Sequence, residues 1–179
     1  MRADSRAYEL TSEQMDKLAS LAIKKGGKGV EPVLDREFVG KDASVIAGKI
    51  GLSIPSSVRL LWGLVDENHP YMWTEQLMPV LPFAVTGSVE RSIELAYEME
   101  GHNGHTAIMH SSNVENLTAM ARKLSCSIFV KNGPSYMGLG MGEGYAALSI
   151  ATPTGDGLVK ARNFTRPLRC TLVDNFRIV

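Results

Sequence analysis

Residues 88–131 constrain the fold more than any other part of the sequence, because helix and strand patterns alternate there at short spacing. Ser88 and Asn113 can each cap a helix that has a single apolar face. Short apolar strands are expected at 106–110 and 126–131. A strand, a helix and a strand in so few residues imply a right-handed parallel crossover. The pattern therefore predicts an α/β domain with an open parallel sheet and flanking helices.

The N-terminal half of the chain holds two helix signals and two strand signals. Thr11 and Gln14 have the spacing of a capping box, which marks the start of a helix. No strand is expected before that helix, which is unusual for an α/β domain and makes the chain look like part of something larger. The expected elements are a helix from Thr11 to Gly26, a helix from Asp42 to Ile50, and extended segments at 58–65 and 79–85.

Glycine is concentrated late in the chain, where Gly133 to Gly157 contain seven of the 17 glycines. Four of them recur at every second residue from Gly138 to Gly144. A dinucleotide-binding fingerprint needs G-x-G-x-x-G between a strand and a helix. We therefore interpret the run as a loop, either structural or lying against a ligand, and not as a phosphate-binding turn.

The charge balance bears on the class of partner. The chain has 19 basic and 19 acidic residues, which argues against a nucleic-acid or anionic-membrane surface. The basic run at 24–29 is interpreted as a solvated helix end, with phosphate contact as the alternative. No signal peptide is evident, and no apolar run approaches the ~20 residues of a membrane helix. Two cysteines without metal or redox spacing favour a reduced, cytosolic setting.

Three groups of side chains are candidates for chemistry. Cys126 begins a strand, where a small buried hydrophobe is more ordinary than a nucleophile, and no adjacent base would lower its pKa. His102, His105 and His110 lack a carboxylate or cysteine to complete a metal set, so no metal is predicted. Glu75 lies on a turn and could accept hydrogen bonds from two hydroxyls, as in a ribose, or simply be solvated.

Four segments, taken in order, carry a resemblance to a known family. Residues 74–80 place an acid four residues before a proline, which resembles the E-x-x-x-P motif of aldehyde dehydrogenases. Residues 105–111, 127–134 and 152–157 resemble the CoA-acylating branch. The resemblance is closest to the propionaldehyde and acetaldehyde dehydrogenases of propanediol- and ethanolamine-utilising bacterial microcompartments. It covers essentially the whole chain but only the C-terminal part of such an enzyme.

The resemblance implies NAD and CoA as cofactors and a short-chain aldehyde as substrate. In that family a cysteine thiolate attacks the aldehyde, a hydride passes to NAD, and CoA releases acyl-CoA. The nucleophilic cysteine and the cofactor-binding domain would precede Met1, so neither Cys126 nor Cys170 inherits the catalytic role. We expect the chain alone to be inactive, with a partial catalytic domain at 1–157 and an oligomerisation segment at 158–179.

The resemblance also assigns roles to individual residues of a complete enzyme. A carboxylate would hold the nicotinamide-ribose hydroxyls, nearby backbone would pack beside the nicotinamide, and a second loop would line the acyl pocket. The carboxylate is that of Glu75. The backbone beside the nicotinamide is that of Leu77 and Met78. The loop that lines the acyl pocket consists of Ile150, Ala151 and Thr152.

The C-terminal segment has two interpretations. Residues 164–173 are expected to form a strand that extends onto a neighbouring subunit, giving a dimer or a dimer of dimers. Alternatively they form an edge strand within the chain, since Pro167 cannot donate to a ladder. The expected location is the cytoplasm, with the interior of a microcompartment left open. A non-catalytic self-association module that keeps only the fold and dimer surface is the alternative function.

Overall fold

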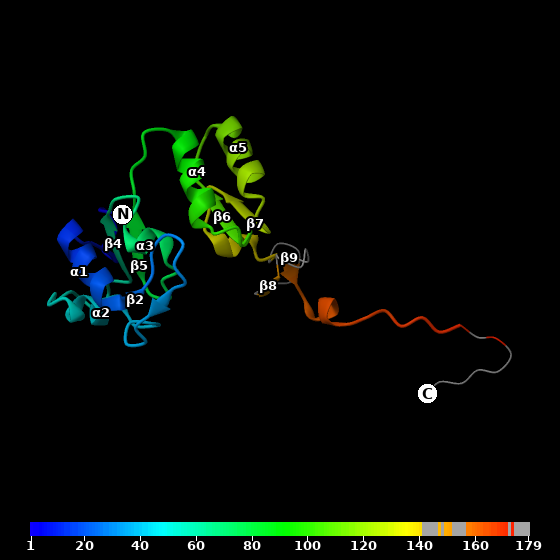
Figure 1. Ribbon diagram of the computed structural model, residues 1–179, viewed down its shortest axis with the longest axis horizontal. Coiled ribbons are helices and arrows are strands. Elements are labelled where there is room, and N and C mark those ends of the chain that lie inside the picture. Colours follow the sequence, from blue (N-terminus) through cyan, green and yellow to red (C-terminus); the bar gives the residue numbers. More distant parts are fainter. Residues whose placement is uncertain (141–146, 148, 152–156, 172, 174–179) are drawn as a thin grey trace. The chain divides into compact units, whose positions relative to one another are not determined.

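The computed structural model describes residues 1–140, 147, 149–151, 157–171 and 173 (Figure 1). The chain divides into two compact units, Met1–Ser92 and Ile93–Val179, and each is described by itself. The predicted boundary between residues 157 and 158 is a different division and stays a prediction. In the described parts of the chain, no helix combines the length and apolarity that crossing a membrane requires.

The first unit contains a sheet of three parallel strands in the order β1 (Ala7–Glu9), β4 (Leu60–Leu64) and β5 (Val80–Phe83). The two extended segments expected at 58–65 and 79–85 are thereby confirmed. The expectation that no strand precedes the first helix is wrong. β1 is only three residues long, too short to show alternation, and it exists because it pairs with β4, in the register Tyr8 to Leu61.

Helix α1 (Ser12–Ala22) begins at the predicted capping box. The Thr11 N–H donates to Gln14 Oε1 at 2.9 Å, and the Gln14 N–H donates to Thr11 Oγ1 at 3.3 Å. The predicted end at Gly26 is wrong, because Ile23 turns to an extended conformation. Strand β2 (Ile23–Lys25) follows directly and pairs antiparallel with β3 (Val33–Leu34).

Two shorter helices complete the first unit. Helix α2 (Ala43–Lys49) lies where the sequence predicts it, although the Asp42 side chain makes no cap hydrogen bond. Helix α3 (Pro70–Trp73) has only four residues and was not expected. The core is formed where α1 and α2 meet one face of the sheet. Its fully buried side chains include Met15, Leu18, Ile46, Leu61 and Tyr71.

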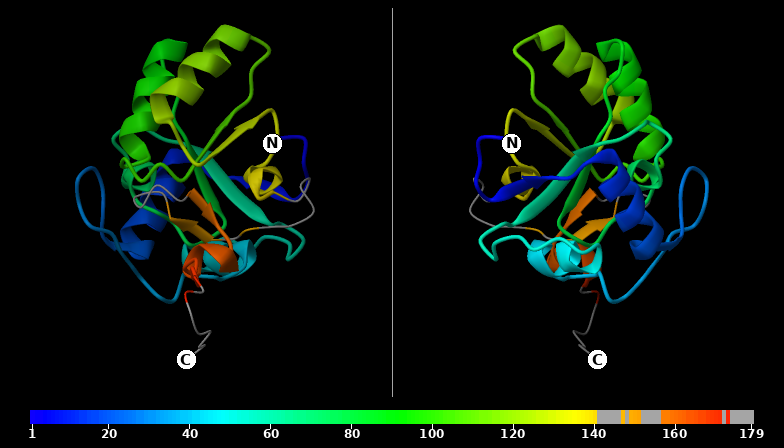
Figure 2. Two further views of the ribbon diagram at one scale, coloured as in Figure 1. Left: turned by 90° about the vertical axis from the view of Figure 1, so that its right-hand side faces the viewer. Right: turned by 90° about the vertical axis from the view of Figure 1, so that its left-hand side faces the viewer.

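The second unit contains the predicted crossover. Strands β6 (Thr106–Met109) and β7 (Ile128–Lys131) are parallel, and α5 (Val114–Leu124) connects them. Asn113 caps α5 by accepting the Glu115 N–H at 2.8 Å. Helix α4 (Val89–Met99) lies beside α5 above the strand pair, as Figure 2 shows. The α/β class with parallel strands and flanking helices is confirmed.

The described C-terminal residues contain short elements only. A 3-10 helix at Ser135–Gly138 precedes β8 (Ser149–Ala151), which pairs antiparallel with β9 (Gly157–Val159). A second 3-10 helix spans Ala161–Phe164. The strand expected at 164–173 is absent from the described residues of that range, because Phe164 ends a 3-10 helix and residues 165–171 and 173 belong to no strand. Formation of that strand on a neighbouring subunit stays a prediction.

Candidate functional site

The loop at 74–79 joins α3 to β5 and carries Glu75. The part of the loop that follows Glu75 is fixed to the first unit by two backbone hydrogen bonds. The Gly40 N–H donates to the Leu77 carbonyl at 2.9 Å, and the Leu61 N–H donates to the Pro79 carbonyl at 2.9 Å. Glu75 itself is exposed. The structure therefore presents a carboxylate to solvent from backbone that is held in place, as an acceptor of ligand hydroxyls requires.

The start of this loop packs against a glycine turn from far away in the sequence. Thr74 is only 5% exposed, and its Oγ1 accepts the Gly27 N–H at 3.0 Å. A Cβ on Gly26 would lie 2.5 Å from that same oxygen. Lys28 Nζ lies 4.5 Å from the Trp73 ring centroid. No local pattern in the sequence predicts this packing, because the two segments are separated by 47 residues.

The residues that follow Glu75 on the loop have different surroundings. The Gln76 Nε2 donates to the Tyr71 carbonyl, which ties the loop back to α3. Leu77 is exposed, whereas Met78 is half-buried and packs against the core of the first unit. Glu75, Leu77 and Met78 are thus brought together on one fixed loop, as the resemblance implied, although their contact with a nicotinamide remains a prediction.

His69 caps the N-terminus of α3, the helix that precedes the loop, and is almost fully buried. Its Nδ1 accepts the Tyr71 N–H at 3.1 Å, so the proton of the neutral ring is on Nε2. Nε2 lies 3.2 Å from Asp16 Oδ1 without the alignment of a hydrogen bond. Burial lowers the pKa of His69, and the nearby Asp16 only partly opposes that effect. His69 is therefore held neutral by its surroundings.

Replacing His69 with asparagine should reduce the loss of stability on acidification. Asparagine can still accept the Tyr71 N–H but does not titrate. The lowered pKa means that the unfolded chain binds a proton where the folded chain does not, so wild-type stability falls as the pH drops below about 6.5. Urea midpoints at about pH 8 and about pH 5 measure this fall. Exposed His110→Asn is the control, and an unchanged pH dependence in His69→Asn would contradict the account.

The predicted acyl-pocket residues lie in the second unit. Ile150 is half-buried in β8 and pairs with Leu158 of β9, and Ala151 pairs with Gly157. Thr152 lies outside the described residues. The structure thus brings Ile150 and Ala151 together on one strand, and their role in an acyl pocket stays a prediction.

The alternative chemical candidates have ordinary surroundings. Burial, together with the nearby Glu100 carboxylate, raises the pKa of the half-buried Cys126 thiol, which is the opposite of what a nucleophile needs. Cys170 is exposed. The His102 ring stacks edge-on against Tyr97 at 4.6 Å between centroids. Among the described residues, no group of three or more histidine, cysteine or acidic side chains could hold a metal ion.

We compared the sequence and the structure with those of known proteins. No protein-family model matches the chain. An acetylating acetaldehyde dehydrogenase of Salmonella typhimurium, EutE, is 46% identical over 174 residues, which are 97% of this chain and 37% of that protein. A CoA-propanoylating propanal dehydrogenase of Citrobacter freundii is 42% identical over 96% of this chain and 36% of its own length.

Solved structures agree with the sequence relatives. A propionaldehyde dehydrogenase from the fucose-utilisation microcompartment of Clostridium phytofermentans has a TM-score of 0.83 at 36% identity, covering 98% of this chain and 39% of that one. The propionaldehyde dehydrogenase of Rhodopseudomonas palustris, solved with CoA and an acylated cysteine, has a TM-score of 0.79 at 41% identity, covering 90% and 36%.

These likenesses place the chain in the aldehyde dehydrogenase superfamily. Within that superfamily the chain is similar along nearly its whole length to one segment of the CoA-acylating aldehyde dehydrogenases, and it spans 37% of the length of the first curated relatives that it matches.

Proposed function

We propose that the chain is the C-terminal catalytic and oligomerisation part of an enzyme that oxidises a short-chain aldehyde to acyl-CoA with NAD and CoA. The observation that carries the proposal is the fixed loop at 74–79, which presents Glu75 within a segment 46% identical to an acetylating acetaldehyde dehydrogenase. A similar structure, an engineered glycolyl-CoA reductase, binds NADP+. We assign NAD on the resemblance to the CoA-acylating dehydrogenases, because the nicotinamide-ribose hydroxyls that Glu75 would bind are free in both NAD and NADP.

The residues of this chain would bind and orient, while the nucleophilic cysteine would come from the polypeptide before Met1. NAD, when bound, accepts the hydride released from the aldehyde carbon. Glu75 would accept hydrogen bonds from both hydroxyls of the nicotinamide ribose, which fixes the ring. The backbone of Leu77 and Met78 would then lie along one face of that ring. Ile150 and Ala151 of β8, together with Thr152, would line the acyl pocket.

The remaining assignments concern assembly and location. The segment at 158–179 would join two copies of the enzyme, and this is supported by the exposure of Phe164 and Leu168. The exposure of Phe164 and Leu168 also favours the second candidate function, which is a non-catalytic self-association module. The expected place of action is the cytoplasm, within a microcompartment if the complete enzyme follows the Clostridium relative.

The test uses a chimera in which this chain replaces the matching segment of the Salmonella acetaldehyde dehydrogenase. Glu75→Gln should raise KM for NAD by about tenfold, because the amide is uncharged and only one of its two terminal atoms can still accept a hydroxyl hydrogen bond. KM for acetaldehyde should stay the same. NADH formation under varied NAD measures the effect.

The matched control for this test is Glu31→Gln, which neutralises another exposed carboxylate of the first unit. It should leave both KM values unchanged. If Glu75→Gln alters neither KM for NAD nor kcat, Glu75 is not part of the cofactor site.

A further inference from the structure

A polar hollow lies between helix α1, strand β2 and the start of helix α3, all in the first unit. Its volume is about 380 Å³, which lies within the range of roughly 300–1,000 Å³ that is usual for small-molecule sites. Its charged and titratable side chains come from three separate elements. They are Asp16 of α1, Lys24 and Lys25 of β2, and His69 at the start of α3.

His69 contributes a buried donor to this hollow, since its side chain is 7% exposed. Because Nδ1 accepts the Tyr71 N–H, the proton of the neutral ring is on Nε2, and Nε2 can only donate. Among the described residues Nε2 has no aligned hydrogen-bond partner, although Asp16 Oδ1 lies 3.2 Å away. A buried donor without a partner costs free energy, so the hollow favours an occupant that supplies an oxygen.

Asp16 sets a second condition on the occupant. Its side chain is 65% exposed, so the carboxylate can turn toward solvent and admit a ligand oxygen to His69 Nε2. An ionised carboxylate only accepts hydrogen bonds, so a ligand oxygen that lies against Asp16 must bring a proton of its own. The pair therefore requires an acceptor oxygen at His69 and a hydroxyl at Asp16 in the same ligand.

The lysines beside the hollow supply positive charge. Lys24 Nζ lies 3.2 Å from Asp35 Oδ2, whereas Lys25 is exposed on the same strand. Both belong to the run at 24–29, which contains three lysines and no acid. Phosphate contact is the alternative that the sequence leaves open for this run, and the structure places the run beside the buried donor of His69.

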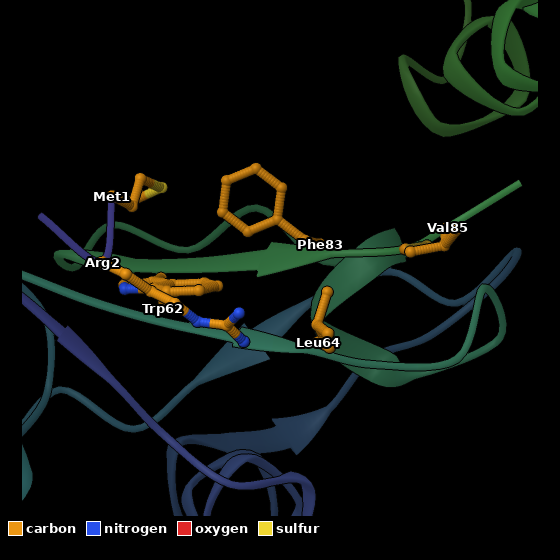
Figure 3. A pocket seen from close by; sticks show the side chains of 7 residues that line it. Met1, Arg2, Trp62, Leu64, Phe83 and Val85 are labelled. Carbon is orange, nitrogen blue, oxygen red and sulfur yellow. The ribbon is translucent and has the colours of Figure 1, made fainter.

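Another hollow of the first unit, of about 490 Å³, has a different character (Figure 3). Aliphatic and aromatic side chains such as Leu64 and Phe83 line most of it. Its charged group, Arg2, is already held by two hydrogen bonds to Glu9, each 2.6 Å long. An oxyanion with a hydroxyl is therefore better matched by the hollow at His69, where a donor, an acceptor and a lysine meet.

We infer that the hollow between α1, β2 and α3 binds a phosphate group that carries a hydroxyl, either inorganic phosphate or a phosphate monoester. One phosphate oxygen accepts the His69 Nε2–H, the P–OH donates to Asp16, and the remaining oxygens face Lys25. Sulfate has the same shape but no hydroxyl, so it would set its charge against the Asp16 carboxylate. The site uses no residue of the loop at 74–79 and goes beyond the proposed function.

The experiment titrates the 179-residue chain with sodium phosphate and, separately, with sodium sulfate in a calorimeter. Equal ionic strength in both titrations removes the general effect of salt on surface charges. At about pH 6.5 inorganic phosphate keeps a P–OH, and a monoester keeps one in part of its molecules. We expect one phosphate per chain and sulfate binding weaker by at least about tenfold. The urea midpoint should rise with phosphate, because the ligand binds only the folded chain.

Three variants assign the contacts. Asp16→Asn should abolish the preference for phosphate over sulfate, because the amide can donate to an oxygen that has no proton. His69→Asn should weaken phosphate binding by at least about tenfold, since asparagine can still accept the Tyr71 N–H but lacks the Nε2 donor. Lys25→Gln should weaken both anions, and the matched control Lys41→Gln, at another exposed lysine of the first unit, should weaken neither.

The inference is overturned if phosphate does not bind, if phosphate and sulfate bind equally, or if Asp16→Asn keeps the preference. Should His69→Asn fail to fold, the exposed Asp16→Asn variant still decides the outcome. Titration with glycerol phosphate distinguishes the two sources of the phosphate group. Tighter binding than inorganic phosphate supports a monoester, and weaker binding supports the free ion. None of these measurements uses enzyme activity, so failure here leaves the proposed function untouched.

Discussion

Leu61→Ala should lower the free energy of unfolding of the first unit by about 3 kcal/mol. Leu61 is fully buried in the central strand, between helices α1 and α2 on the core face of the sheet. Truncation loses the transfer free energy of the removed carbons and leaves a cavity that the fixed strand cannot close. Urea unfolding followed by tryptophan fluorescence measures the loss in the free energy of unfolding. This signal reports on the first unit, because both tryptophans, Trp62 and Trp73, lie there.

The control for Leu61 is the same substitution three residues further along the strand. Leu64 is half exposed on the opposite face, so Leu64→Ala should change the free energy of unfolding by less than about 1 kcal/mol. Equal losses for the two variants would contradict the assignment of the core to the α1–α2 face.

Gly26→Ala should destabilise the first unit by about 2 kcal/mol. The new Cβ would lie 2.5 Å from Thr74 Oγ1 and 2.7 Å from Ile23 Cγ2, so at least one of these side chains must move. Movement of Thr74 would break its hydrogen bond with Gly27 and shift the start of the loop that carries Glu75. Urea unfolding measures the loss of stability, and KM for NAD in the chimera measures the shift of the loop.

Two further variants isolate the cause of that loss. Gly48→Ala, in a helix with open space around the glycine, should raise stability by about 0.5 kcal/mol. The double variant Gly26→Ala/Thr74→Ala should lose less than the sum of its single losses, because removing the Thr74 hydroxyl makes room for the Cβ. Additive losses would show that the Gly26–Thr74 contact is not the source.

The features predicted correctly from the sequence are those that local patterns specify. The capping box of α1, the Asn113 cap of α5, the apolar stripes of both helices and the apolar runs of β4, β6 and β7 appear where expected, because each depends on neighbours within a few residues. β1 could not be predicted, because its three residues become a strand only through pairing with β4, far along the chain. The helix end at Ala22 was missed for the same reason, since β2 exists through its pairing with β3.

The candidate site shows the same division. Glu75 and its turn were visible in the sequence, and the resemblance to aldehyde dehydrogenases gave the acid a role. The hydrogen bonds that hold the turn could not be predicted, because their donors, Gly27 and Gly40, lie in distant parts of the sequence. The strand expected at 164–173 depends on hydrogen bonds that the described residues of this chain do not supply.

The most direct test of the central claim compares the isolated chain with the chimera in one assay, supplied with acetaldehyde, NAD and CoA. If the chain is the C-terminal part of a CoA-acylating aldehyde dehydrogenase, the chimera forms NADH and acetyl-CoA in equal amounts and the isolated chain forms neither. Formation of NADH by the isolated chain, or a folded chimera that makes no acetyl-CoA, would contradict the account.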